Sequence, residues 1–294
     1  MNKKISATIL SILTIGGLIY TLVHITNNQA FANAYKPIES NSDFTSGESD
    51  SKEQSINPTE ELSRLQKSLI AHGGGALSGD TYLNCYDAIK YYYDKGIRLF
   101  ELDVEYTSDG MPVMIHSWDG FQWKYLGLDR NIVCKYDEFK NAKMKNNYTQ
   151  LDLESLSNYM LTEFKEMYWI TDTKADNKKL LSTLAVNYPY LLDNIIPQVY
   201  NQEEYFYAKN LGFKNIIYTL YMSEDTDEEI IEFCKNNNVF AITMPTYRAI
   251  NSSLSKDLYN IGVYVYTHTV NSDEEYKYLK SVGIQGIYTD TLFF

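Results

Sequence analysis

The chain has 294 residues, enough for one large domain or two small ones, and a core of that size needs no disulfide or metal for stability. Lys and Arg number 26 against 38 Asp and Glu, and the resulting net charge of −12 argues against a nucleic-acid-binding protein, which needs a basic surface. The hydrophobic fraction of 44% excludes a wholly disordered chain. Cys85, Cys134 and Cys234 are too few and too scattered for a disulfide framework, and none forms a CxxC zinc motif.

The first 32 residues have the features of an export signal. Lys3 and Lys4 precede an uncharged apolar stretch over 5–25, and residues 30–32 supply small side chains at the spacing that a signal peptidase prefers. The stretch is longer than the usual apolar segment of about 7–15 residues and close to the roughly 20 that span a bilayer. We therefore predict that residues 1–32 are a cleaved signal peptide or a retained membrane anchor; a buried N-terminal helix is the less favoured alternative. Either way, the rest of the chain is expected to be secreted or held at the cell surface.

Residues 33–57 are rich in Ser, Asn, Asp and Glu and contain almost no large apolar side chain. Such a segment cannot repay the entropy of ordering, so we predict a disordered polar linker. Pro58 begins a helix-start pattern in which Leu62 and Leu65 offer a short apolar face. The folded domain is therefore expected over 58–294.

Short apolar runs with strand character alternate with helical patterns throughout this domain. The predicted strands are Leu69–Ala71, Ile97–Val104, Tyr168–Thr171, Ile195–Val199, Ile216–Leu220, Val239–Thr243, Val263–Tyr266 and Gly286–Thr289. The predicted helices include Tyr82–Tyr93, Asp152–Glu166, Asp227–Asn236 and Asp273–Ser281. Eight strands with intervening helices predict an α/β protein with a closed (β/α)8 TIM-type barrel. An open doubly wound sheet is the alternative, weakened because no glycine-rich dinucleotide motif follows the first strand.

Two places depart from the regular alternation. Residues 104–116 contain Ser108, Asp109 and Gly110 between extended runs, which predicts a hairpin after the second strand, followed by a polar and aromatic insertion over 117–150. Its aromatic residues either bind a lipid or sugar or pack within the loop; they are Trp118, Phe121, Trp123 and Tyr125. The barrel is also expected to lack its last helix, because few residues follow the last strand, and the segment 58–67 is a candidate to cover that opening.

The three histidines of the predicted domain, His72, His116 and His268, each follow a predicted strand or hairpin arm. The C-terminal ends of the strands are where (β/α)8 barrels carry their active sites. We therefore expect His72 and His116 to be functional, whereas His268 is equally well explained as a structural residue that caps a loop.

Carboxylates occupy the same predicted end of the barrel. Glu101 and Asp103 alternate on one face of the second strand, and Asp172 and Asp290 end two others. Buried like charges need a compensating cation, and oxygen ligands without thiolates favour Mg²⁺ or Ca²⁺. A salt-bridged rim with Lys174 or Arg98 is the structural alternative.

Glycines at 73, 74 and 75 follow His72 directly. Glycine lets the backbone approach a phosphate closely and present its N–H groups, so this run is a weak indication of phosphate binding.

Together these residues resemble the glycerophosphodiester phosphodiesterase family, within the phosphatidylinositol-phospholipase-C-like barrels. The family pattern E-x-D-V-x-x-T-x-D-G-x-x-V-x-x-H is matched without a gap by Glu101, Asp103, Val104, Thr107, Asp109, Gly110, Val113 and His116. Further matches over residues 68–290 are His72 and Gly74 of the family's His-Arg-Gly, Asn84 of its Glu-Asn pair, and Lys174 of its Glu-x-Lys strand. Residues 269–271 and 286–290 resemble the family's last two strand ends.

The resemblance implies a role for each of these positions. Glu101, Asp103 and Asp172 would hold one divalent cation, Mg²⁺ or Ca²⁺; His72 and His116 would be the acid/base pair; and Lys174, Gly73, Asn84 and His268 would contact the substrate. Gly73 stands where the family has an arginine, and Leu83 where it has a glutamate. Asp172 replaces a glutamate and His268 a tryptophan, and His268 is expected to restore some of the missing positive charge.

The resemblance thus implies an exported, metal-dependent phosphodiesterase that hydrolyses glycerophosphodiesters derived from phospholipids or from glycerol-phosphate polymers. One alternative is a metal-independent lyase similar to the phosphatidylinositol phospholipases C, and another is an inactive surface binding protein on the same barrel. We expect a monomer with a small-molecule, lipid or cell-wall phosphodiester as its substrate and with no nucleic-acid partner, attached to a membrane through residues 1–32 if these are not cleaved.

Overall fold

The computed structural model describes residues 65, 69–129 and 132–293, all of which belong to the second of the chain's two compact units, Ser55–Phe294. The predicted export signal, the linker and the helix start at Pro58 lie outside the described residues. Among the helices that the structure describes, none combines the length and the apolar character needed to span a bilayer.

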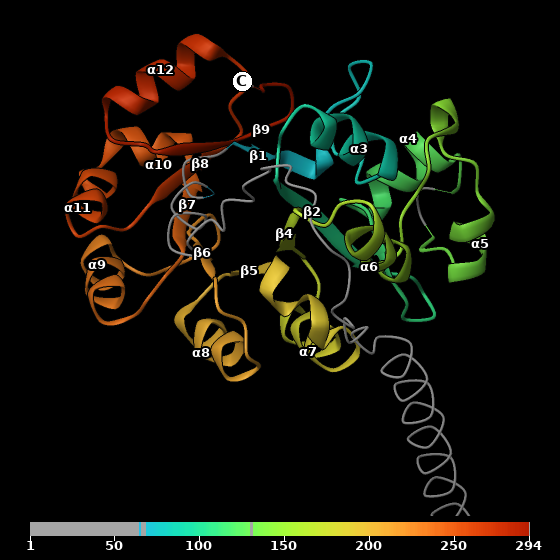
Figure 1. The fold of residues 1–294 in the computed structure, drawn as a ribbon, viewed down its shortest axis with the longest axis horizontal. Coiled ribbons are helices and arrows are strands. Elements are labelled where there is room, and N and C mark those ends of the chain that lie inside the picture. Colours follow the sequence, from blue (N-terminus) through green and yellow to red (C-terminus); the bar gives the residue numbers. More distant parts are fainter. Residues whose placement is uncertain (1–64, 66–68, 130–131, 294) are drawn as a thin grey trace, which may run out of the picture. The chain divides into compact units, whose positions relative to one another are not determined.

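Eight parallel strands close into a ring (Figure 1). They are β1 (Ile70–Ala71), β2 (Leu99–Tyr106), β4 (Tyr168–Asp172), β5 (Ile195–Val199), β6 (Ile217–Thr219), β7 (Ala241–Pro245), β8 (Val265–His268) and β9 (Gly286–Thr289). The ring has no free edge because β1 pairs with both β2 and β9. Outside the ring, β3 (Pro112–Met114) pairs antiparallel with the end of β2. The predicted TIM-type barrel and its hairpin are thus confirmed, and the open sheet is wrong.

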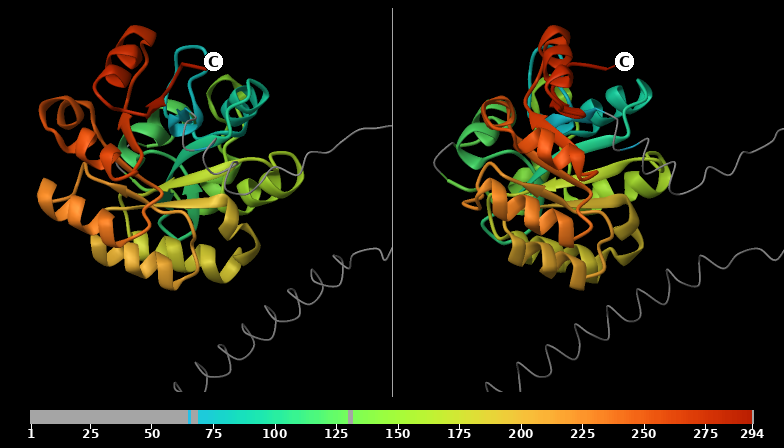
Figure 2. Two further views of the ribbon diagram at one scale, coloured as in Figure 1. Left: turned by 60° about the vertical axis from the view of Figure 1, so that its left-hand side comes forward. Right: turned by 90° about the vertical axis from the view of Figure 1, so that its left-hand side faces the viewer.

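Helices surround the ring, as Figure 2 shows. They are α3 (Tyr86–Asp94), α4 (Trp123–Leu126), α5 (Tyr136–Asn141), α6 (Leu153–Thr162), α7 (Asn177–Asn187), α8 (Gln202–Asn210), α9 (Asp227–Asn236), α10 (Thr246–Asn251), α11 (Leu254–Asn260) and α12 (Asp273–Ser281). Short helical turns occur at η1 (His72–Gly74), η2 (Trp118–Gln122), η3 (Lys145–Asn147) and η4 (Pro189–Asn194). Both α9 and α12 have their predicted limits. Each begins where a hydroxyl, of Thr226 or of Ser272, accepts a hydrogen bond from a backbone N–H group of the first turn.

The start of α3 differs from the prediction. The helix begins at Tyr86 rather than at Tyr82, because Tyr82 and Asn84 have φ of +56° and +47°, in the left-handed region that interrupts a right-handed helix. Residues 82–85 therefore form an irregular segment ahead of the helix. This segment brings Tyr82 to the functional site.

The interior of the ring is closed at one end by apolar side chains from the beginnings of the strands, including Ile70 and Leu99. Leu65 is only 3% exposed and packs into this cluster, where the Tyr266 hydroxyl donates to its carbonyl at 3.4 Å. Leu65 is the one described member of segment 58–67, so the expectation that this segment covers the opening beside the last strand stays a prediction. Leu65 itself lies at the apolar end of the barrel interior, where burial of its side chain is stabilising.

The segment after β9 and the insertion over 117–150 complete the described part of the fold. Among the described residues no helix follows β9; instead, the ring of Phe293 lies 6.2 Å from that of Tyr92 on α3. The insertion over 117–150 has a small core of its own, in which Phe121 and Tyr125 are buried, so these two aromatic residues pack rather than grip a ligand. All three cysteines are free and buried.

Candidate active site

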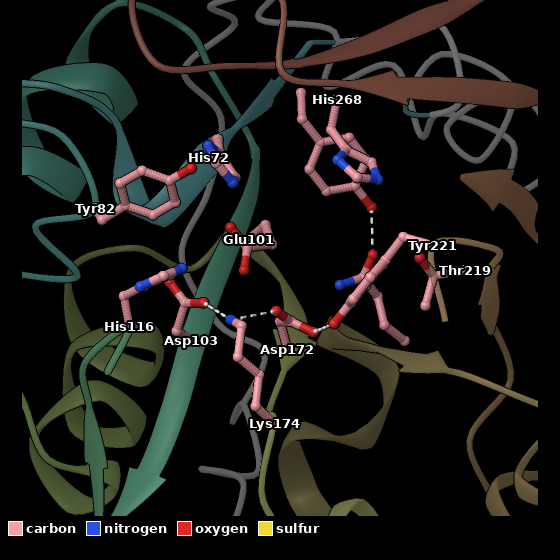
Figure 3. Close-up of a pocket in the computed structure, with 12 residues that line it drawn as sticks. His72, Tyr82, Glu101, Asp103, His116, Asp172, Lys174, Thr219, Tyr221 and His268 are labelled. Carbon is pink, nitrogen blue, oxygen red and sulfur yellow. Dashed lines mark hydrogen bonds and ion pairs between the residues drawn. The ribbon is translucent and has the colours of Figure 1, made fainter. Parts of the chain in front are cut away.

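One pocket lies at the C-terminal ends of the ring strands (Figure 3). Seven of the nine predicted site residues line it: His72, Glu101, Asp103, His116, Asp172, Lys174 and His268. The other lining residues are Tyr82, Gln198, Thr219, Tyr221 and Tyr288. Parallel strands explain this convergence, since their C-terminal ends all meet at the same end of a barrel.

The three predicted metal ligands form a compact buried cluster. Glu101 and Asp103 extend from β2, and Asp172 ends the neighbouring strand β4, where it is directly opposite Asp103 in the register. One carboxylate oxygen from each lies within 4.8 Å of the others. Burial, followed by the charges of Asp103 and Asp172, raises the pKa of Glu101 well above its ordinary value. The protein alone therefore stabilises these negative charges poorly.

The surroundings of the cluster fit a hard divalent cation. The Lys174 ammonium lies 3.4 Å from Asp103 and 3.5 Å from Asp172, and among the described lining residues it is the one side chain with a permanent positive charge. Although burial opposes it, the charges of Asp103 and Asp172 raise the pKa of Lys174 above its ordinary value. One ammonium cannot balance three carboxylates, and three oxygen ligands without sulfur suit Mg²⁺ or Ca²⁺.

Tyrosine hydroxyls complete the surroundings of Asp172. Tyr200 donates to Asp172 Oδ1, and Tyr221 donates to the same oxygen at 3.4 Å. Both hydrogen bonds fix the orientation of the carboxylate while its second oxygen faces Lys174. The orientation of Asp172 is thus fixed by two tyrosines, one directly after β5 and one in the loop after β6.

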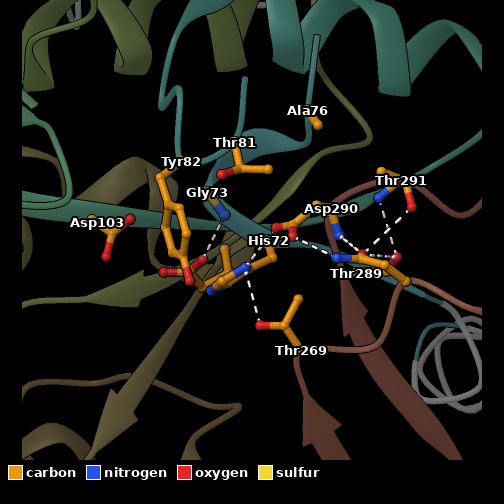
Figure 4. A network of polar contacts seen from close by, with 12 residues as sticks. His72, Gly73, Ala76, Thr81, Tyr82, Asp103, Thr269, Thr289, Asp290 and Thr291 are labelled. Carbon is orange, nitrogen blue, oxygen red and sulfur yellow. Dashed lines mark hydrogen bonds and ion pairs between the residues drawn. The ribbon is translucent and has the colours of Figure 1, made fainter. Parts of the chain in front are cut away.

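His72 is oriented by a hydrogen-bond network that joins the first and last strands of the ring (Figure 4). Its Nδ1 lies 2.8 Å from Asp290 Oδ1, and Asn271 donates to the other oxygen of this carboxylate at 2.7 Å. The amide oxygen of Asn271 accepts from the backbone N–H of Asp290, also at 2.7 Å. Because a carboxylate accepts, Nδ1 carries the proton and Nε2 is left free to act on a ligand.

The aromatic ring of Tyr82 lies against both predicted catalytic histidines. The ring centroids are 4.6 Å apart for Tyr82 and His72, and 4.4 Å apart for Tyr82 and His116. The two imidazoles are therefore separated by no more than the sum of these distances, close enough to act on one phosphate group. Burial lowers the pKa of His116 below its ordinary value, against the opposing charge of Asp103.

Gly73 and Asn84 have other roles than the predicted contact with substrate, and neither lines the pocket. The backbone N–H of Gly73 donates to Glu101 at 2.8 Å, so it is not free to bind a phosphate. Asn84 is fully buried; its side chain donates to Asp103 Oδ2 and accepts from the Asp103 backbone N–H, each at 2.9 Å. Both residues instead orient carboxylates of the buried cluster.

His268 lines the pocket, but it does not supply the expected positive charge. Burial, with a smaller contribution from His72, lowers the pKa of His268 to about 4, so the imidazole is neutral near pH 7. Its Nε2 is buried and has no hydrogen-bond partner among the described residues, and the same is true of the fully buried Thr219 hydroxyl. This part of the pocket therefore offers uncharged polar groups to a ligand.

Tyr82, Asn271, Tyr200 and Tyr221 are site residues that the sequence analysis missed. Tyr82 was assigned to a helix, and 27 tyrosines in the chain gave no reason to select three of them. Asn271 lies in the segment 269–271, which resembles a strand end of the family, but the resemblance gave it no role. Asp290 was expected at the barrel rim, but its pairing with His72 became apparent only from the closed ring.

Comparisons with known proteins agree with this fold. No family model and no curated protein matches the sequence. Among solved structures, the chain is similar to a glycerophosphodiester phosphodiesterase from Parabacteroides distasonis, with 21% identity, a TM-score of 0.60, and coverage of 76% of this chain and 92% of that one. A putative glycerophosphoryl diester phosphodiesterase from Silicibacter pomeroyi gives 17% identity, a TM-score of 0.60, and coverage of 79% and 94%.

A phosphodiesterase from Oleispira antarctica, solved in complex with the product sn-glycerol-3-phosphate, gives 16% identity, a TM-score of 0.56, and coverage of 76% and 92%. At these identities the likeness establishes a shared fold. It is the barrel of the family that the sequence motif resembles, so the expected architecture is confirmed.

Proposed function

We propose that this chain is a metal-dependent phosphodiesterase that hydrolyses glycerophosphodiesters by acid/base catalysis with His72 and His116. The observation that carries the proposal is the placement of both imidazoles on one tyrosine ring, in the pocket that also holds three buried carboxylates. A phosphodiester needs charge neutralisation and two proton transfers, and this pocket contains groups suited to each task.

Glu101, Asp103 and Asp172 would hold the divalent cation. When bound, such an ion neutralises the charge that develops on the phosphate oxygens during attack. The hydrogen bonds from Gly73, Asn84 and Tyr200 hold the three carboxylates in place before any ion arrives. The site is thus preorganised by this chain's own residues.

The surroundings of the two histidines support different roles for them. His116 has a lowered pKa and is neutral at pH 7, so it takes the proton from the attacking hydroxyl group. Asp290 holds the His72 ring through Nδ1 and leaves Nε2 to the pocket, so we assign to His72 the second proton transfer, to the leaving alkoxide. The attacking group is water or a neighbouring hydroxyl of the substrate.

The proposed substrate class rests on the sequence motif and on the structural neighbours, which include one phosphodiesterase solved with sn-glycerol-3-phosphate. We further propose that the enzyme acts outside the cytoplasm as a monomer, secreted or anchored through residues 1–32. Deacylated phospholipids, lysophospholipids and glycerol-phosphate polymers are all available there.

The test is an assay of the purified full-length chain against a panel of these phosphodiesters, after EDTA treatment and then with Mg²⁺ or Ca²⁺ restored. We expect hydrolysis that EDTA abolishes and one of the two ions restores. Turnover that EDTA does not affect would favour the lyase alternative. No turnover of any diester with either ion would favour a binding protein.

A further inference from the structure

Tyr82 occupies a position in the pocket that the proposed mechanism does not yet use. Its ring makes an edge-to-face contact with His72, at an interplanar angle of 70°, and a tilted contact with His116, at 54°. Figure 3 shows the ring on the pocket wall with its hydroxyl directed toward the interior beside His72. The phenol thus separates the two imidazoles and faces the space between them.

The Tyr82 hydroxyl is available to a ligand. The structure gives it no hydrogen-bond partner among the described residues, whereas Tyr221 donates to Asp172 and Tyr288 donates to Gln198. A phenol is protonated at neutral pH, and burial raises the pKa of Tyr82 further, followed by the charge of Asp290. The pocket therefore presents a neutral donor between its two histidines.

The backbone around Tyr82 is arranged to hold it there. Its φ of +56° is rare for a bulky residue, and the segment is tied down by the Asn84 N–H, which donates to the Gly73 carbonyl at 2.8 Å. A Cβ atom at position 73 would lie 2.7 Å from the Cα of Tyr82, closer than side chains are found. Glycine after His72 is therefore what allows Tyr82 to approach the pocket.

Cationic groups cannot easily fill the same role. Lys174 is already within 3.5 Å of two carboxylates, and His268 is neutral on the opposite side of the pocket. A phosphate that lies between His72 and His116 still needs a donor for its non-bridging oxygens. Tyr82 is the lining residue whose free hydroxyl lies beside both histidines.

We propose that the Tyr82 hydroxyl donates a hydrogen bond to a non-bridging oxygen of the bound phosphate, while its ring sets the spacing of His72 and His116. This inference rests on the proposed phosphodiesterase function. It assigns to a neutral tyrosine the phosphate contact that the resembled family makes with the arginine replaced here by Gly73.

Tyr82→Phe in the full-length chain tests the hydroxyl, because the phenyl ring keeps both imidazole contacts. We expect kcat/KM for a glycerophosphodiester to fall by about 10–100-fold, the usual loss for a hydrogen bond to a charged group. The affinity for inorganic phosphate, measured by calorimetry with the activating cation present, should fall to a similar extent. The melting temperature should stay unchanged. Tyr247→Phe, at a position 67% exposed, is the matched control and should change neither quantity.

Tyr82→Leu tests the spacing role, since it removes the ring as well. We expect a larger loss of kcat/KM than in Tyr82→Phe, together with a shifted pH profile as the imidazoles lose their shared neighbour. Wild-type kcat/KM and wild-type phosphate affinity in Tyr82→Phe would overturn the inference. A wild-type chain that hydrolyses no diester would overturn the proposed function. The role of Tyr82 would still be decided by calorimetry, because phosphate binding can be measured without turnover.

Discussion

The two walls of the pocket differ in charge. One wall, called the acidic wall here, is built by β1–β4 and the segments that follow these strands. Its lining residues are His72, Tyr82, Glu101, Asp103, His116, Asp172 and Lys174. The neutral wall, from β5–β9 and their loops, holds Gln198, Thr219, Tyr221, His268 and Tyr288. The groups suited to chemistry therefore come from fewer than half of the ring strands. The other strands supply uncharged groups: Tyr221 orients Asp172, Tyr288 donates to Gln198, and the buried polar atoms of Thr219 and His268 have no partner among the described residues.

This contrast indicates how such a site keeps its stability. Buried charges of one sign are costly, so they are gathered at one place where a cation can bind all of them. The neutral wall contributes no further buried charge and therefore does not increase this cost. Substitutions on the acidic wall should consequently change activity strongly, whereas substitutions on the neutral wall should change it little.

The largest expected effect is the loss of either histidine of the acidic wall. His72→Ala and His116→Ala should each lower kcat by about 10²–10⁴-fold, the usual contribution of acid/base catalysis. The double variant should lose less than the product of the two losses, because the histidines act together. A substrate with a p-nitrophenol leaving group needs little protonation, so it should rescue His72→Ala and not His116→Ala. Near-wild-type hydrolysis by either single variant would end the two-histidine mechanism.

Glu101→Gln should separate activity from stability. We expect metal-dependent activity to fall by more than about 100-fold. Loss of a residue that only orients a metal ligand costs about 10–100-fold, and loss of the ligand itself should cost at least as much. In EDTA the variant should be more stable than wild type, because one of three crowded charges is gone. Urea unfolding at pH 7 measures this, with the exposed Glu274→Gln as the control. A destabilised, metal-free Glu101→Gln would show that the carboxylates are structural.

The walls should also respond to pH in opposite directions. The pKa of Glu101 is raised in the folded chain, so metal-free stability falls as the pH rises above the ordinary value near 4.5. The pKa of His268 is lowered to about 4 from 6.5, so stability is lost as the pH falls between these values, by up to about 3 kcal/mol. His268→Phe should remove the second dependence and leave the first, as followed by unfolding at several pH values. If His268→Phe lost as much stability as wild type between pH 6.5 and pH 4, the burial of a neutral imidazole at this position would be contradicted.

The smallest effect is expected at Thr219 on the neutral wall. Its hydroxyl is buried without a partner among the described residues, so Thr219→Val should leave stability within about 1 kcal/mol of wild type. Thr267→Val is the matched comparison, since that equally buried hydroxyl donates to the Met244 carbonyl at 2.9 Å and its loss should be more destabilising. Hydrolysis of bis-p-nitrophenyl phosphate, which has no hydroxyl groups, should be unchanged in Thr219→Val. Equal destabilisation by both substitutions would show that the Thr219 hydroxyl has a partner.

The sequence predicted the acidic wall better than the neutral wall, for physical reasons. His72, Glu101, Asp103 and Asp172 lie on or directly after apolar strands, where alternation and chain order fix their direction. Tyr82 could not be found in this way, because its position depends on a left-handed backbone and on the close approach of Gly73. The neutral wall depends on long-range packing among side chains that are common elsewhere in the chain, so no local pattern distinguished them.

The contact between His72 and Asp290 joins residues that are 218 positions apart, and it has a consequence for folding. The Asp290 backbone carbonyl also accepts from the Ala76 N–H and the Tyr92 hydroxyl, each at 2.8 Å, so β9 fastens the whole segment that follows β1. Contacts of such high sequence separation carry a large loop-closure entropy and form late. The carboxylate cluster needs only β2 and β4, which are neighbours in the ring. A chain whose β9 has not yet docked would therefore already possess its carboxylate cluster, while His72 still lacked its orienting partner. Catalytic competence would then be the last property acquired in folding and the first lost when β9 separates from β1.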